Sequence, residues 1–134
     1  MKKVKYDVNL SNFNDIIKMT DSTALVVYES AGHDSWIKTL KIATDGSVTN
    51  PATLEHDYGN SDHPSLIRMN SDTYALAYEG NNSYGRIQTF TIPPDGSSIA
   101  EISNIVFTNN GEAEFNNIVR VDDNTFAIFG SNYN

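Results

Sequence analysis

Three segments of this chain are near copies of one another, and this internal repeat restricts the fold more than any other feature. The segments are MTDSTALVVYES (19–30), NSDTYALAYEG (70–80) and VDDNTFAIFGS (121–131), and their aligned threonines are 50 and 52 residues apart. A longer match joins WIKTLKIATDG (36–46) to RIQTFTIPPDG (86–96) at the same offset of 50 residues. A period in this range is typical of proteins in which one small structural unit stacks on the next.

Each repeat has the pattern of short β-strands separated by tight turns. Branched and aromatic residues form runs bounded by Asp, Ser, Asn and Gly, and Asp-Gly follows the third run of both complete repeats. We therefore divide the chain into repeats at about 1–50, 51–100 and 101–134, of which the last is incomplete. The expected strands span 4–8, 16–19, 24–28, 36–42, 53–56, 66–69, 74–78, 86–92, 102–107 and 126–129.

Apolar residues in the central strands are consecutive rather than alternate. The runs ALVVY (24–28) and FAIF (126–129) offer apolar side chains to both faces of a sheet, whereas a sheet with one wet face alternates. We therefore expect a single all-β domain whose sheets are covered on both faces. Stacked four-stranded blades fit this pattern better than an irregular β-sandwich or a β-trefoil, whose three units should all be complete.

The pattern T-[YF]-A-[LI]-x-[YF] followed by I-x-T-[LF]-x-I-x-x-D-G resembles the blades of bacterial β-propeller repeat proteins. This resemblance implies a β-propeller-like all-β fold with four-stranded antiparallel blades, about two and a half blades per chain. It points to no specific subfamily, because the Trp-Asp dipeptide, the kelch double glycine and the sialidase-type Asp box are absent from the sequence. The fold class by itself carries no function.

Two blades and part of a third cannot close a ring, and the open edge would expose unpaired backbone groups. Residues 4–8 align with the fourth strand of a repeat and could complete the last blade, so that chains joined head to tail close the ring. We expect a homo-oligomer, with a dimer favoured. The alternative is a purely structural fragment of a longer propeller.

The chain is acidic, with 17 Asp and Glu against 9 Lys and Arg in 134 residues and a formal net charge of −8. An acidic surface repels phosphate groups, so we expect no nucleic-acid partner. Cysteine is absent, which excludes disulfides and thiolate metal sites. No run fits a signal peptide or a membrane span, so we expect a soluble protein without a membrane partner, in a compartment that stays unknown.

Ligand-binding residues are expected in the longer loops, because loops on a rigid scaffold carry most binding sites. The loops ESAGHDSW (29–36) and EGNNSYGR (79–86) are equivalent in the repeat and rich in polar and aromatic residues. Trp36, the only tryptophan, could stack on a sugar ring, although ordinary packing between blades explains it as well. The candidate ligand-binding set is Glu29, His33, Trp36, Glu79, Tyr84 and Arg86.

No catalytic, metal or cofactor motif stands out. His33, His56 and His63 lack the close spacing of zinc sites, and His56 and His63 are expected at the surface. We therefore favour a non-catalytic binding or interaction module over an enzyme, with carbohydrate as the favoured ligand class. The alternative from another class is a glycoside-active enzyme in which Glu29 and Glu79 share the chemistry, which requires carboxyl groups roughly 5–10 Å apart.

Overall fold

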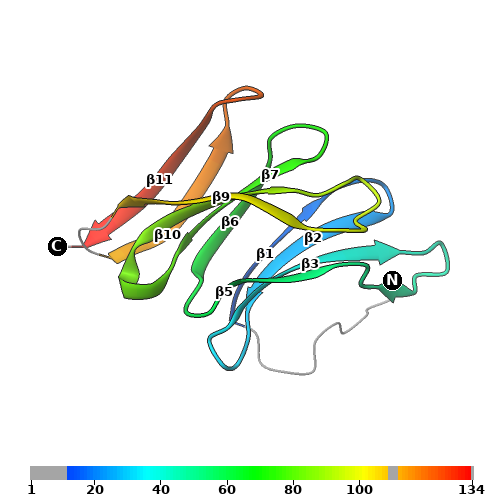
Figure 1. Ribbon diagram of the computed structural model, residues 1–134, viewed down its shortest axis with the longest axis horizontal. Coiled ribbons are helices and arrows are strands. Elements are labelled where there is room, and N and C mark those ends of the chain that lie inside the picture. The colour runs from blue at the N-terminus through cyan, green and yellow to red at the C-terminus, as the bar shows by residue number, and fades with distance from the viewer. Residues whose placement is uncertain (1–11, 109–111, 134) are drawn as a thin grey trace.

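The chain forms three antiparallel β-sheets that lie against one another as layers (Figure 1). The computed structural model describes residues 12–108 and 112–133, so the strand expected at 4–8 lies outside the described residues. The first sheet contains β1 (Asn12–Lys18), β2 (Thr23–Glu29), β3 (Ser35–Ile42), β4 (Val48–Thr49) and β5 (Thr53–Asp57). The middle sheet contains β6 (Asp62–Arg68), β7 (Thr73–Glu79), β8 (Gly85–Thr91) and β9 (Ala100–Thr108). The third sheet contains β10 (Glu112–Arg120) and β11 (Phe126–Tyr133). The expected all-β fold with antiparallel pairing is confirmed.

The first and middle sheets have the same topology at an offset of 50 residues. β1 and β6 begin and end 50 residues apart, and so do β2 and β7. Strands pair in sequence order in both sheets, β1-β2-β3-β5 and β6-β7-β8-β9, and β4 only extends the end of β3. The first turn of each sheet is closed by the same backbone bond, donated by Met19, Met69 and Val121 to the carbonyls of Thr23, Thr73 and Thr125.

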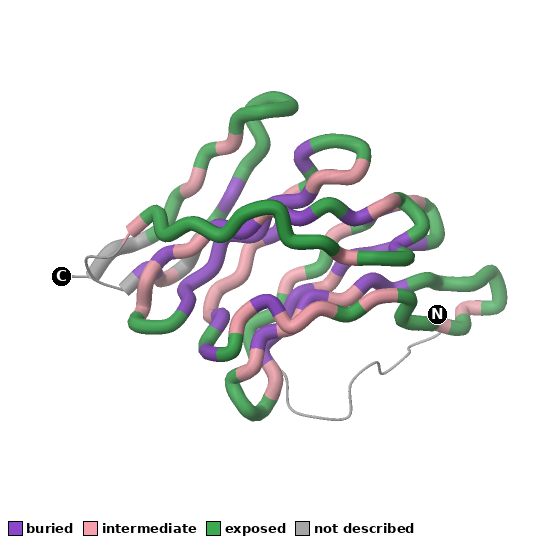
Figure 2. The backbone as a smooth tube through the Cα atoms, in the orientation of Figure 1, coloured by how far each residue is buried: buried purple, intermediate pink, exposed green. Residues whose placement is uncertain are grey.

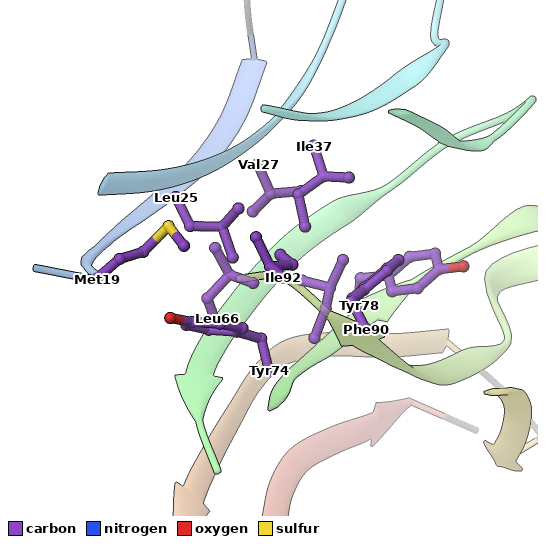
Figure 3. Close-up of a cluster of buried hydrophobic side chains, with 10 residues drawn as sticks. Met19, Leu25, Val27, Ile37, Leu66, Tyr74, Tyr78, Phe90 and Ile92 are labelled. Atoms are coloured by element: carbon purple, nitrogen blue, oxygen red, sulfur yellow. The ribbon is translucent and has the colours of Figure 1, made fainter. Parts of the chain in front are cut away.

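One hydrophobic core fills the space between the first and middle sheets. Figure 3 shows Leu25 and Val27 of β2 pointing toward Leu66 of β6 and Ile92, which follows β8. The remaining buried members of this core are Met19, Ile37, Tyr74, Leu76, Tyr78 and Phe90. Burying a large apolar side chain contributes about 1.5–3 kcal/mol, so this core is the main force that holds the two sheets together.

A second core lies on the opposite face of the middle sheet. Ala75 and Ala77 of β7 pack with Ile87 and Met69 against Ile118 of the third sheet. Buried positions are therefore concentrated in the middle of the stack, as the purple segments in Figure 2 show. Both faces of the middle sheet are therefore covered, one by the first sheet and the other by the third sheet.

Consecutive apolar residues are buried in one run and partly exposed in the other, and among the described residues only the middle sheet is covered by another sheet on both faces. In β2 the run ALVVY is buried except for the half-buried Val26. In β11 Ala127 and Phe129 are exposed, while Phe126 and Ile128 are half-buried against the middle sheet. The outer face of the third sheet is therefore uncovered within residues 12–108 and 112–133.

Replacing Leu76 with Ala should lower the free energy of unfolding by about 2–5 kcal/mol, because the truncation leaves a cavity between the first and middle sheets. The matched control is Ile102→Ala on β9, where the side chain is exposed and the loss should be about 0.5 kcal/mol or less. Denaturant unfolding followed by circular dichroism measures both. Equal losses for the two variants would show that Leu76 is not part of a packed core.

Candidate functional site

Two equivalent hairpin loops place polar side chains at one end of the stack. Residues 30–34 join β2 to β3, and residues 80–84 join β7 to β8. Each loop is closed by a backbone bond from its first N–H to its last carbonyl, 2.8 Å from Ser30 to Asp34 and 2.9 Å from Gly80 to Tyr84. His33 and Ser83 hold the same place in the two loops with φ of 68° and 59°. The turn therefore imposes a left-handed residue at this place whatever its side chain.

Glu29, the last residue of β2, is buried beneath the first of these loops. Only 2% of the residue is exposed, whereas the side chain of His33 is 67% exposed. Nδ1 of His33 contacts Oε1 of Glu29, so an exposed imidazole covers a buried carboxyl group. The hydrogen bond offsets part of the cost of removing the carboxyl group from water.

A second carboxyl group reaches Glu29 from the middle sheet. Asp62, the first residue of β6, acts on Glu29 through its negative charge. Burial raises the pKa of Glu29 above its ordinary value, the bond from His33 lowers it, and the negative charge of Asp62 raises it again. A nearby negative charge disfavours ionisation, so Asp62 adds to the effect of burial and favours the protonated form of Glu29.

A β-bulge brings two further polar side chains to the same end. β1 and β6 both shift register against their partner strands near their first residues, where Phe13 and His63 have φ of 41° and 50°. Nδ1 of His63 lies 3.8 Å from Oε2 of Glu79, and the ring of Phe13 lies 4.8 Å from that of His63. Asp62 pairs directly with Glu79 across β6 and β7. We call the resulting group the junction cluster: Glu29, His33, Asp62, His63 and Glu79.

A separate polar network is buried between β5 of the first sheet and β8 of the middle sheet. Nδ1 of His56 lies 2.8 Å from Oε1 of Gln88, whose Nε2 donates to the His56 carbonyl and to Glu101, each at 3.0 Å. Because the amide oxygen of Gln88 is an acceptor, Nδ1 of His56 carries the proton. Nε2 of His56 has no partner in the described part of the chain, and burial lowers the pKa of His56 to about 4.

The expectation that His56 lies at the surface is wrong, whereas His63 is only partly exposed. His56 is buried because it packs against the middle sheet, where Gln88, 32 residues away in sequence, contacts its Nδ1. His63 is half-buried because it belongs to β6 rather than to a loop. Neither cause is visible in the local sequence.

The structure brings together three of the six predicted site residues, Glu29, His33 and Glu79. Trp36 lies on the face of β3 that points away from the middle sheet, where Nζ of Lys38 is 6.0 Å from its ring centroid. Arg86 of β8 donates from Nη1 to Oδ1 of Asn104 at 3.2 Å, and Tyr84 is the residue that closes the second loop. These three residues have other neighbours and are not part of the junction cluster.

Sequence reasoning missed Asp62 and His63, which it placed in the loop 57–65. The signal that could have found them is the repeat itself, because Asp62 and His63 align with Asn12 and Phe13 at the offset of 50 residues. Continuing the strands to these positions would have placed Asn12 and Phe13 beside the end of β2, and Asp62 and His63 beside the end of β7.

Comparisons with known proteins do not assign the chain. No protein-family model matches it, and no curated protein is significantly similar to it. Across residues 12–108 and 112–133, no three His, Asp or Glu side chains are arranged to hold a metal ion. The same ranges contain no helix that is both long and apolar enough to cross a membrane. What the chain binds must therefore be inferred from the junction cluster itself.

Stability should fall as the pH drops below 6.5, because the folded state resists protonation of His56 and the unfolded chain does not. The pKa of His56 in the folded state is about 4, so the loss of unfolding free energy grows from pH 6.5 down to about pH 4. The loss is about 1.4 kcal/mol per pH unit in this range and then levels off. The difference in unfolding free energy between the wild type and His56→Gln, measured by urea unfolding from pH 4 to 8, isolates this effect. A difference that does not change with pH would contradict it.

Glu29→Gln should become more stable relative to the wild type as the pH rises. The raised pKa of Glu29 means that its contribution is complete below the unfolded value of 4.5 and is lost as the pH rises through the folded value. Glutamine keeps an acceptor for His33 and carries no charge beside Asp62. Urea unfolding against pH measures the trend, with Glu55→Gln on β5 as the control. A relative stability that declines toward neutral pH would show that burial and the charge of Asp62 do not govern the ionisation of Glu29.

Proposed function

We propose that this chain is a non-catalytic binding module built on β-propeller architecture. The architecture is supported by two sheets in which four strands pair in the same sequence order, the first two strands of each lying 50 residues apart. It is also supported by the faces that meet: Leu25 and Val27 face the middle sheet, and their equivalents Ala75 and Ala77 face the third sheet. The same face of one sheet thus meets the next, which is the relation between successive blades.

The ligand site that we assign is the junction cluster together with Phe13. The observation that carries it is the exposed imidazole of His33 fixed on the buried carboxyl group of Glu29, with the exposed ring of Phe13 beside His63. A sugar offers an apolar C–H face that packs on an aromatic ring and hydroxyl groups that bond to carboxylates and imidazoles. Carbohydrate is therefore the ligand class that this combination fits.

The scaffold holds these side chains in place before a ligand arrives. Glu29, Asp62 and Glu79 lie at the ends of paired strands, and His33 lies in a hairpin loop closed by a backbone bond. Side chains fixed on strands and closed turns lose little conformational entropy on binding. A rigid site of this kind needs no loop closure to bind.

A glycan array probed with the purified chain should detect a restricted set of glycans. Asp62→Asn and Phe13→Ala should each weaken binding about tenfold or more, because one removes a charged acceptor and the other the apolar ring. The matched control is Asp21→Asn, at the opposite end of β1 and β2, where the side chain is fully exposed. Silence across a broad array would refute carbohydrate as the ligand, and an equal loss for the control would refute the site.

A glycoside-active enzyme is the second candidate, and the raised pKa of Glu29 favours it. A carboxyl group that keeps its proton can act as a general acid, with Glu79 as the partner carboxylate. Hydrolysis of a bound glycan, abolished in both Glu29→Gln and Glu79→Gln, separates this candidate from a binding module. Binding without any turnover supports the module.

A further inference from the structure

We propose that the outer face of the third sheet binds the outer face of the first sheet in a second copy of this chain, head to tail. In each sheet we call the face that meets the following sheet the forward face and the other the back face. The two surfaces lie on the outer sides of the stack, away from the interface that holds the junction cluster. The inference therefore goes beyond the proposed function and does not depend on a sugar ligand.

The forward face of the third sheet exposes residues that its counterparts bury. Val121 is 64% exposed and Phe129 is 82% exposed. In the first two sheets the equivalent residues are buried beneath the next sheet, namely Met19 and Met69 for Val121, and Val27 and Ala77 for Phe129. The third sheet thus has an interface surface without its partner in the described residues.

The back face of the first sheet likewise exposes apolar residues whose equivalents in the middle sheet are buried. Ile16 is 58% exposed and Ile42 is 43% exposed, whereas their equivalents Leu66 and Ile92 are buried against the first sheet. Ile16, Ala24 and Ile42 line a groove of about 320 Å³. An apolar groove at the positions where the middle sheet receives its neighbour fits the forward face of another sheet.

One hydrogen bond between neighbouring sheets recurs at equivalent positions of the repeat. Oδ2 of Asp15 accepts from the N–H of Leu66 at 2.7 Å, and 50 residues on, Oγ of Ser65 accepts from the N–H of Ile118 at 3.3 Å. The next acceptor in the series is the side chain of Asn117, which is exposed on the third sheet. The donor at the matching position is the N–H of Ile16 in a second copy, which within one chain donates to Oδ1 of Asp15 at 2.8 Å.

A second polar contact joins the first and middle sheets, whereas the equivalent arginine of the third sheet, Arg120, donates to the carbonyl of Asp122 instead. Nη1 of Arg68 donates to the carbonyl of Met19 at 2.8 Å, across the first interface. Lys18 is the repeat equivalent of Arg68, and Val121 is that of Met19. In the assembled pair, Lys18 would exchange Asp21, with which it pairs at 2.6 Å within one chain, for the carbonyl of Val121 in the other copy.

Compared with the interfaces inside the chain, the proposed interface has a larger side chain on the forward face and a smaller one on the back face. The forward face carries Phe129 where the other sheets have Val27 and Ala77, and the back face of the first sheet carries Ala24 where the middle sheet has Tyr74. These two differences change side-chain volume in opposite directions, so the total volume at the proposed interface stays close to that of the first one. Because one chain carries both complementary surfaces, a second copy is the partner that fits, and two copies joined at both interfaces would close a ring.

The oligomeric state measured by sedimentation velocity or multi-angle light scattering tests this interface. The wild type should be a dimer or larger closed assembly at micromolar concentration. Phe129→Asp and Ile16→Asp should each be monomeric, with association weakened about 100-fold or more. The matched control is Tyr58→Asp, an equally exposed aromatic residue at 84%, which should leave the assembly intact.

Mixing the two variants tests the pairing itself. Phe129→Asp keeps its back face and Ile16→Asp keeps its forward face, so an equimolar mixture should form a heterodimer through the one intact interface. The double variant should stay monomeric in any mixture. Circular dichroism checks the fold, and the milder pair Phe129→Ser and Ile16→Ser replaces any variant that fails to fold. A monomeric wild type, single variants that still associate, or a mixture without a complex would each overturn the proposal.

Discussion

Burial of the middle sheet on both faces is the constraint on which the rest of the structure depends. In β7, Tyr74, Leu76 and Tyr78 face the first sheet, and Ala75 and Ala77 face the third, and all five are inaccessible to solvent. A strand that is apolar at every position is stable only when both of its faces are removed from water. The middle sheet therefore requires two neighbours, and the repeat supplies them as further sheets of the same pattern.

Polar contacts decide how the apolar layers fit together. Apolar surfaces alone would permit the first sheet to slide over the middle sheet, since the hydrophobic effect has no direction. His56 with Gln88, and Oγ of Ser35 with the carbonyl of Gly59, are buried pairs that are satisfied in one arrangement. Because an unpaired buried polar group costs about 1–3 kcal/mol, each pair penalises every other register. The polar groups therefore determine the relative position of the two sheets more than they stabilise the packing between them.

The repeat made most of the fold predictable, and the site only in part. Strand order and turns follow from local patterns, such as the Asp-Gly turns with Gly46 and Gly96 at positive φ. The starts of β1 and β6 were missed because Phe13 and His63 lie in bulges, where one additional residue breaks the alternation that marks a strand. Asp62 was missed for a different reason: its contact with Glu29 joins two sheets, and no pattern within one strand reports such a contact.

The two buried glutamates show where repeat symmetry ends and chemistry specific to one site begins. Glu29 and Glu79 are equivalent, yet each is approached by a histidine from a different element. His33 comes from the loop that follows Glu29, whereas its counterpart near Glu79 is Ser83; His63 comes from the bulge of β6, whereas its counterpart in β1 is Phe13. Stacking of the sheets needs neither histidine, because Ser83 and Phe13 adopt the same backbone conformations without one. Together these departures from the repeat give a single interface an exposed imidazole, an aromatic ring and three carboxyl groups, and His33 also compensates the burial of Glu29.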